Sequence, residues 1–295
     1  MEKNDKWYKE FTDKLELTGL RPRTVDVYSR AVKQLQDHYS KNPKEITELE
    51  VQEYLLYRKN RSKWASPTLK TALCGIRYYY QMMLDADWKL FKIAKFTTEN
   101  KLPTVLTKEE VDRVLRCARP FNNYVYLVLV YTCGLRLSEA LNIEVSDIDR
   151  ERMVIHIHRG KGAKDRLVPL PKSTLKLLRR YWSTHRHSKF IFPRTHTNKH
   201  GAPVNALAED TVNKGCAQNA MRNAVKKANI TKKGVSVHTL RHCYATHLLE
   251  SGVNLRYIQI YLGHSTILST LVYLHLTAAG NSDAYDIIDN LMDRF

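Results

Sequence analysis

The sequence has few cysteines, and their placement argues against two common kinds of scaffold. Its five cysteines are scattered singly, with no Cys-x-x-Cys pair. This pattern indicates neither a disulfide framework nor a zinc ribbon, and it predicts reduced thiols in a cytosol-like compartment. The chain also lacks any run of about eighteen apolar residues, and its first residues, MEKNDKWYKEF, carry charges where a signal peptide needs an apolar stretch. We therefore expect a cytoplasmic protein with no membrane partner.

Acidic residues are the minority among the charged side chains. Lys and Arg number 48 against 30 Asp and Glu, which gives a formal net charge of +18 at pH 7. An excess of this size attracts polyanions over long distances, so nucleic acid is the leading candidate partner. On charge alone, a basic protein that is merely soluble stays the alternative.

Length and periodicity predict two domains. A chain of 295 residues exceeds the usual size of one compact domain. Apolar residues recur at helical spacing from Lys6 to about Phe91, which predicts a helical domain over residues 1–92. Residues 93–105 lack periodicity and mix Lys, Thr, Asn and Pro, as linkers do. Residues 106–295 then form a second domain.

The second domain is predicted to combine helices with a small β-sheet. Thr107 and Glu110 have the spacing of a capping box at a helix start. Residues 153–158 and 166–170 alternate like strands on either side of a turn rich in Gly and Lys, which predicts a β-hairpin. The apolar run KFIFP, at 189–193, predicts a further short strand. Without internal repeats, the expected fold class is mostly α with a small β-sheet (α+β).

Several basic side chains have the chemistry that phosphodiester cleavage needs. Without a metal, that reaction requires cations for the phosphate charge, a nucleophile, and an acid for the departing oxygen. Arg136 follows Gly134 in the sequence TCGLRLSEAL, at a predicted turn. A guanidinium there could pair with two phosphate oxygens, but a surface arginine after a helix C-cap explains the pattern equally well.

The sequence HTLRH gives a sharper signal. His238 and Arg241 are three residues apart, so on a helix an imidazole and a guanidinium share one face. The imidazole can move a proton near neutral pH while the guanidinium binds phosphate. Zinc binding by His238 and His242 is the weaker alternative, because no catalytic Glu and no third ligand accompany them. We therefore expect neither a metal nor a cofactor.

Two further motifs follow in order, LGHS at 262–265 and then Tyr273. Together these motifs resemble the six-residue signature of the tyrosine recombinases, the phage-integrase and Xer-type family. In order and approximate spacing, the matching residues are Arg136, Lys161, His238, Arg241, His264 and Tyr273. The resemblance covers about residues 105–280, and the segment before residue 92 resembles that family's core-binding domain only in length, helicity and basic edge.

The resemblance implies an N-terminal helical core-binding domain and a C-terminal catalytic domain. It implies a site-specific recombinase that cuts and rejoins DNA through a 3′-phosphotyrosine, with Tyr273 as the nucleophile. By the same resemblance, Arg136 and Arg241 bind the phosphate, His238 assists proton movement and His264 donates a hydrogen bond. Lys161, or the nearby Lys164, protonates the leaving 5′-oxygen. Glu139 orients the site, and an exposed helix charge is the alternative for this residue.

The implied partners are double-stranded DNA carrying a recombination site and further copies of the chain, in a tetramer on DNA. Basic residues are the candidate DNA contacts: Arg58, Lys59, Arg61, Lys63, Lys70 and Arg77 in the first domain, and Lys226, Lys227, Lys232 and Lys233 in the second. An apolar stripe of Ala284, Ile287, Ile288 and Leu291 predicts a C-terminal helix that packs on its own domain or docks on a neighbouring protomer. Strand relaxation like that of a type IB topoisomerase and a non-catalytic DNA-binding regulator stay as alternative functions.

Overall fold

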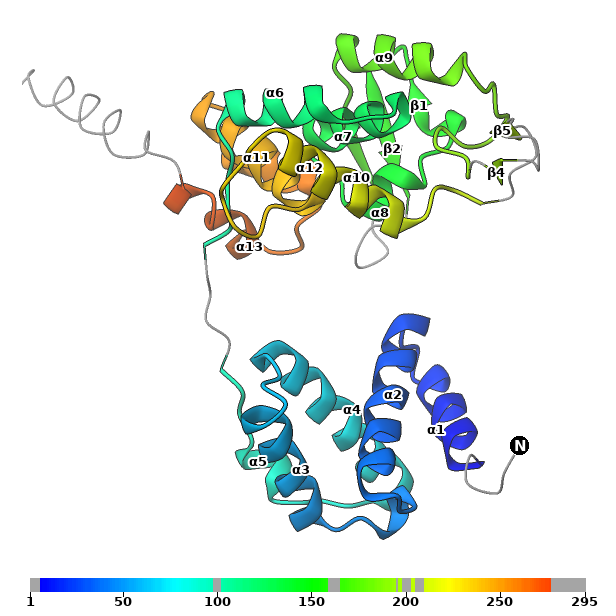
Figure 1. Cartoon of the computed structure of the whole chain (residues 1–295), viewed down its shortest axis with the longest axis vertical. Helices are drawn as coiled ribbons and strands as arrows, with labels where there is room; N and C mark the ends of the chain where they lie inside the picture. Colours follow the sequence, from blue (N-terminus) through cyan, green and yellow to red (C-terminus); the bar gives the residue numbers. More distant parts are fainter. Residues whose placement is uncertain are drawn as a thin grey trace, which may run out of the picture. The chain divides into compact units, whose positions relative to one another are not determined.

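The computed structural model divides the chain into two compact units, Met1–Lys101 and Leu102–Phe295. It describes residues 6–97, 102–158, 165–194, 196–197, 203–204 and 210–276. Each unit has its own hydrophobic core. Figure 1 shows the helices and strands of both units. The predicted C-terminal helix with Ala284, Ile287, Ile288 and Leu291 lies outside the described residues.

The described part of the first unit is helical. Its α-helices are α1 (Lys6–Leu17), α2 (Pro22–Tyr39), α3 (Glu48–Asn60), α4 (Ser66–Leu84) and α5 (Leu90–Ile93). Both α2 and α4 have a proline in their first turn. Backbone N–H groups in the first turn of a helix have no intrahelical partner, so the N–H that proline lacks costs no hydrogen bond there. Trp7 and Phe11 of α1 pack edge-on against Tyr79 of α4, with ring centroids 5.4 and 5.1 Å away. These aromatic contacts join the first and fourth helices.

The second unit mixes helices with short strands. Its α-helices are α6 (Lys108–Cys117), α7 (Phe121–Cys133), α8 (Leu137–Leu141), α9 (Lys172–Trp182), α10 (Lys214–Lys227), α11 (Val237–Glu250), α12 (Leu255–Leu262) and α13 (Leu268–Leu271). Its strands are β1 (Ile148–Asp149), β2 (Val154–Ile157), β3 (Arg166–Pro169), β4 (His196–Thr197) and β5 (Pro203–Val204). The predicted capping box begins α6, because Thr107 and Glu110 each accept a hydrogen bond from the other's backbone N–H. The mostly helical α+β fold class is confirmed.

The main sheet is antiparallel, in the order β1-β2-β3. Ile155 and Ile157 of β2 are buried, whereas the side chains that alternate with them lie on the more accessible face. The strand expected at 189–193 is wrong. Only Phe190 and Pro193 make isolated bridges there, with Glu144 and Thr211. Backbone hydrogen bonds from Val145 to Lys189 and from Val212 to Phe192 flank these bridges, but neither pairing extends into a ladder of several bridges.

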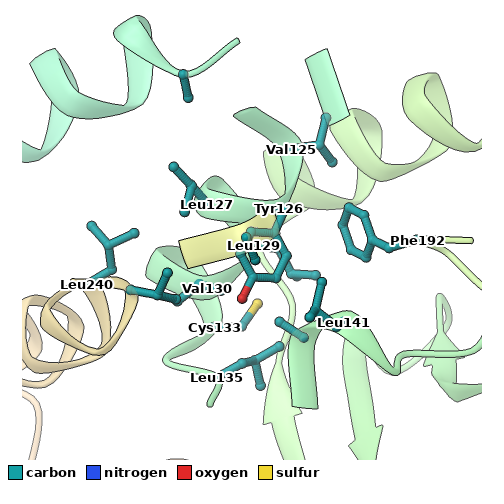
Figure 2. Packing of buried hydrophobic residues seen from close by; sticks show 14 of the residues in the cluster. Val125, Tyr126, Leu127, Leu129, Val130, Cys133, Leu135, Leu141, Phe192 and Leu240 are labelled. Atoms are coloured by element: carbon teal, nitrogen blue, oxygen red, sulfur yellow. The ribbon is translucent and has the colours of Figure 1, made fainter. Parts of the chain in front are cut away.

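Helix α7 lies in the centre of the second core. Figure 2 shows Val125, Leu129 and Val130 of this helix among side chains from other elements, including Leu240 of α11. Helix α7 ends at Gly134, whose φ of +59° suits glycine, and a Cβ there would lie 2.3 Å from the Tyr244 ring. The turn therefore brings the chain past α11 immediately before Arg136. Within the described residues, no helix is long and apolar enough to cross a membrane.

Candidate active site

The C-terminal end of α12 is surrounded by arginines. The last carbonyls of a helix lack intrahelical partners and carry its partial negative charge, so they attract cations. Three consecutive carbonyls there each accept a hydrogen bond from a different guanidinium: Tyr261 from Nε of Arg166 (2.8 Å), Leu262 from Nη2 of Arg241 (2.5 Å), and Gly263 from Nη2 of Arg136 (3.1 Å). A helix end thus positions side chains from three distant parts of the second unit.

Glycine is required at the end of α12. Gly263 has a φ of +63°, and a Cβ on it would lie 2.8 Å from Cδ of Arg166. A larger residue would therefore strain the backbone and displace the Arg166 side chain. The LGHS motif thus closes the helix and leaves room for a guanidinium beside it.

Glu139 is the carboxylate at the centre of the arginines. Its two oxygens accept from both Nη atoms of Arg166, at 3.0 and 2.7 Å, and Oε1 also accepts from Nη1 of Arg136, at 2.7 Å. Nη1 of Arg241 lies 3.9 Å away. Burial raises the pKa of Glu139, but the hydrogen bonds and charges of Arg166 and Arg136 outweigh it and lower the pKa to about 2. Glu139 therefore stays ionised at neutral pH.

Arg241 is the most deeply buried of these cations, with 1% of its surface exposed. Its Nη1 donates to the Gly134 carbonyl at 2.7 Å, and its Nε has no hydrogen-bond partner in the described structure. Burial and the nearby Arg136 lower its pKa to about 9, so it remains protonated at pH 7. Three guanidiniums and one carboxylate leave the cluster with a net charge of +2. Such a fixed excess of positive charge suits a phosphate.

Tyr273 lies beside this cluster, just before the 3-10 helix η4 (Leu274–Leu276). Its side chain is buried, with 2% of the residue exposed, and its Oη is hydrogen-bonded to Nδ1 of His242 at 3.0 Å. Burial raises the pKa of the phenol, while the charges of Arg241 and Arg136 act to lower it. The two guanidiniums therefore favour the ionised phenolate, whereas burial opposes it.

Three imidazoles complete the cluster. The His238 ring packs edge-on against His242, with centroids 4.6 Å apart, and the His264 ring lies parallel to Tyr273 at 6.4 Å. His264 Nδ1 is hydrogen-bonded to Oγ1 of Thr270 at 2.9 Å. Burial, followed by the neighbouring positive charges, lowers the pKa values of His242 and His264 to about 4 and also lowers that of His238. All three rings are therefore neutral at pH 7.

The structure brings together all the predicted catalytic residues that it describes: Arg136, Glu139, His238, Arg241, His264 and Tyr273. Lys161 and the alternative Lys164 lie outside the described residues. Sequence reasoning missed Arg166 and the contact of His242 with Tyr273. Arg166 follows GKGAKD in the same motif as Lys161, and His242 shares a helix face with His238, so both carried a local signal.

The predicted DNA-contact residues differ in their surroundings. Arg58 packs its guanidinium over the rings of Trp64 and Tyr54, at 4.7 and 5.0 Å from the centroids. Lys232 is paired with Glu110 at 2.6 Å and donates to the Val105 carbonyl at 3.0 Å. Arg77 is partly buried, and the others are exposed: Lys59, Arg61, Lys63, Lys70, Lys226, Lys227 and Lys233. Arg58 and Lys232 thus have structural partners within the chain.

Comparison with known proteins identifies the family. The model of the "Phage integrase family" matches residues 104–279, and that of the "Phage integrase, N-terminal SAM-like domain" matches residues 7–90. Tyrosine recombinase XerD of Halalkalibacterium halodurans is 31% identical over 287 residues, which cover 90% of this chain and 91% of XerD. These matches support the interpretation as a recombinase. They do not support the alternatives of a topoisomerase or a non-catalytic regulator.

Solved structures share the fold. XerH recombinase in a post-cleavage complex with palindromic difH substrate has a TM-score of 0.68 at 20% identity, over 90% of this chain and 80% of XerH. A lambda integrase tetramer bound to a Holliday junction has a TM-score of 0.69 at 16% identity, over 88% of this chain and 76% of the integrase chain. Sequence and fold therefore agree that the chain belongs to the phage integrase family and is a tyrosine recombinase.

Proposed function

We propose that Tyr273 is the nucleophile with which this recombinase breaks and rejoins DNA strands. One observation carries the proposal: a tyrosine hydroxyl lies beside a cluster of guanidiniums whose directions are fixed by Glu139 and by the end of α12. Fixed cations stabilise the charge that grows on a phosphate during attack, because they need no reorganisation at that moment. The six-residue signature adds support from the sequence.

The proposed reaction exchanges one phosphate ester bond for another. Oη of Tyr273 attacks the scissile phosphorus, the bond from phosphorus to the 5′-oxygen breaks, and a 3′-phosphotyrosine and a 5′-hydroxyl result. Nδ1 of His242 is the nearest acceptor for the phenolic proton, since it is neutral and hydrogen-bonded to Oη. Lys161 supplies the proton to the 5′-oxygen. Attack by a 5′-hydroxyl from another strand reverses these steps, and because the intermediate retains the ester, neither ATP nor a cofactor is needed.

The proposed phosphate site is formed by Arg136 and Arg241, whose Nε has no hydrogen-bond partner in the described structure, and not by Arg166. Arg136 is the more accessible, with 22% of its side chain exposed, whereas Arg166 has 6% exposed. All three side-chain nitrogens of Arg166 also donate hydrogen bonds within the chain, to Glu139 and to the Tyr261 carbonyl. We therefore assign Arg166 to positioning Glu139 and α12. His264 and His238 would complete the hydrogen bonding to the phosphate and nucleophile.

The proposed partners are double-stranded DNA with a specific site and further copies of this chain. Support comes from the XerH complex with its difH substrate and the lambda integrase tetramer on a Holliday junction. The net charge of +18 favours the same partner. Among the predicted contact residues, the exposed lysines suit phosphates better than Arg58 or Lys232, which are engaged within the chain. Such a reaction on chromosomal or plasmid DNA would take place in the cytoplasm.

A covalent-adduct experiment tests the nucleophile. Tyr273→Phe removes only the hydroxyl, so the variant should bind DNA but give no SDS-resistant protein–DNA band on a nicked suicide substrate. Tyr257→Phe, at an exposed position on α12, is the matched control and should give the adduct at the normal rate. An SDS-resistant band with Tyr273→Phe would refute the assignment.

A leaving-group experiment tests Lys161 separately. Lys161→Ala should slow cleavage of an ordinary strand by about 100-fold, a typical contribution for a general acid. The defect should largely vanish on a substrate whose 5′ leaving atom is sulfur, because a thiolate departs without a proton. An equal defect on both substrates would remove Lys161 from this role, and Lys164→Ala in parallel decides between the two lysines.

A further inference from the structure

A second group of titratable side chains lies at the end of the β2–β3 hairpin where residues 159–164 connect the two strands. His156 and His158 alternate along the chain, so both side chains lie on the accessible face of the sheet. Asp165 immediately precedes β3, beyond the pairing of Ile157 with Arg166. One ligand atom from each of these three residues lies within 4.8 Å of the others. The proposed strand-transfer chemistry uses none of the three.

Two of the separations among these atoms match those of neighbouring ligands around a metal ion. Oδ2 of Asp165 lies 3.3 Å from Nε2 of His156 and 3.5 Å from Nδ1 of His158. A tetrahedral zinc ion with bonds of about 2.0–2.2 Å separates its ligand atoms by about 3.3–3.6 Å. The carboxylate oxygen is thus already at the separation of a neighbouring ligand from each of the two nitrogens, which lie within 4.8 Å of one another. The two rings are also close, with centroids 3.9 Å apart.

A buried carboxylate orients one of the rings. The other nitrogen of His158, Nε2, lies 2.9 Å from Oδ1 of Asp147, and only 10% of the Asp147 side chain is exposed. A hydrogen on Nε2 would be donated to Asp147, which leaves the lone pair of Nδ1 directed towards Asp165. Metal-bound histidines usually donate their second N–H to a carboxylate or carbonyl in this way. The Nδ1 lone pair and the carboxylate repel each other unless a proton or a metal cation lies between them.

The protein offers space for a further ligand beside these residues. A cavity of about 270 Å³ is bordered by His156, His158 and Asp147 and extends to Asn142 and Glu139. It is large enough for several waters, one of which can fill a fourth coordination position. An ion can therefore reach the histidines from solvent without rearrangement of the sheet.

We propose that His156, His158 and Asp165 bind a divalent transition-metal ion of the zinc class. Two imidazoles and one carboxylate suit Zn²⁺ or Co²⁺ better than Mg²⁺ or Ca²⁺, which prefer oxygen ligands alone. The ion joins the residue after β2 to the residue before β3, and so ties the two strands together beside the segment that connects them. This set is distinct from the pair His238 and His242, and it lies outside the arginine cluster.

Cobalt binding tests the proposal without any DNA reaction. Titration of the full chain with Co²⁺ should give one equivalent bound, with the visible absorption of a tetrahedral ion, and Zn²⁺ should displace it. His156→Ala/His158→Ala should abolish this absorption. Asp147→Asn, which leaves all three ligands in place, should weaken binding by roughly 10- to 100-fold. His38→Gln, at an exposed position in the first unit, is the matched control and should bind as the wild type does.

Circular dichroism checks that each variant is folded. The single variant His156→Gln should disturb the fold least, since 40% of that side chain is exposed, and its Co²⁺ affinity provides a second measurement. A wild-type chain that binds no stoichiometric Co²⁺ would overturn the proposal. Equal binding by the double variant would also overturn it, because another group such as the exposed Cys216 would then be the ligand. A covalent adduct formed normally in either case leaves the assignment of Tyr273 intact, so the two proposals fail separately.

Discussion

The two units hold their buried or half-buried arginines in different ways. In the second unit, backbone carbonyls and a carboxylate fix Arg241 and Arg136, so each N–H bond has a defined direction. In the first unit, the Arg58 guanidinium lies over the faces of the Trp64 and Tyr54 rings. The ring faces attract its positive charge but do not fix the direction of its N–H bonds. A reaction centre needs fixed directions, whereas attraction of DNA needs only charge at the surface.

The largest expected effect comes from removing the carboxylate that joins the arginines. Glu139→Gln leaves three guanidiniums without their counterion, two of them almost fully buried. We expect the free energy of unfolding of the second unit to fall by about 3–5 kcal/mol, as when a buried ion pair loses one partner. Strand cleavage should fall by about 100-fold or more, because the guanidiniums lose their alignment. Native-state hydrogen exchange of α11 and a suicide-substrate assay measure the two effects.

A matched control separates this effect from the general loss of a negative charge. Glu144→Gln removes a carboxylate from the same stretch of chain, but its partner Lys189 is exposed and 3.4 Å away. We expect a change of less than about 1 kcal/mol and nearly normal cleavage. Equal losses in the two variants would show that Glu139 is an ordinary surface charge and that the arginine cluster is held by α12 alone.

The sequence predicted those parts of the site that are encoded locally. His238 and Arg241 share a helix, and Arg136 follows a glycine turn, so short motifs were sufficient to identify them. Arg166 was missed as a site residue because its partners are distant in sequence: Tyr261 is 95 residues away and Glu139 is 27. Its role exists only once the end of α12 lies beside β3.

The fold shows the same division between local and distant information. The alternation over 153–158 predicted β2 correctly, because one face of that strand is buried and the other is accessible. The run at 189–193 was mistaken for a strand because apolar composition cannot show whether neighbouring segments pair with it over several residues. Whether a ladder forms there depends on the segments near Glu144 and Thr211, which make one bridge each.

An intermediate effect concerns pH and the imidazole that contacts Tyr273. Burial, His238 and Arg241 lower the pKa of His242 to about 4, against about 6.5 in an unfolded chain. As the pH falls from 6.5 towards 4, the unfolded chain binds a proton that the folded chain does not, so stability is lost in that window. His242→Gln should remove this dependence, which we expect to amount to about 2 kcal/mol because the ring is partly solvated.

The measurement is hydrogen exchange of α11 at pH 7 and pH 4.5, with rates corrected for intrinsic pH dependence. His38→Gln, in the first unit, should keep the wild-type loss of stability. The remaining loss in His242→Gln reports the other imidazoles whose pKa values are lowered in the same direction, which are His185, His238, His247 and His264. A wild-type loss that is unchanged in His242→Gln would show that this ring is not the neutral acceptor beside the Tyr273 hydroxyl.

The smallest effect compares lysines of the two units in DNA binding. Lys59 is exposed on α3, whereas Lys232 is paired with Glu110 and the Val105 carbonyl. If Lys59 neutralises one phosphate, Lys59→Ala should reduce the slope of log affinity against log salt by about 0.9. Lys232→Ala should leave the slope unchanged, because its charge is already compensated within the chain. Filter binding at several salt concentrations measures both slopes. Equal reductions in the two variants would mean that the Lys232–Glu110 pair opens when DNA binds. Pairing within the chain would then not distinguish lysines that contact DNA from those that do not.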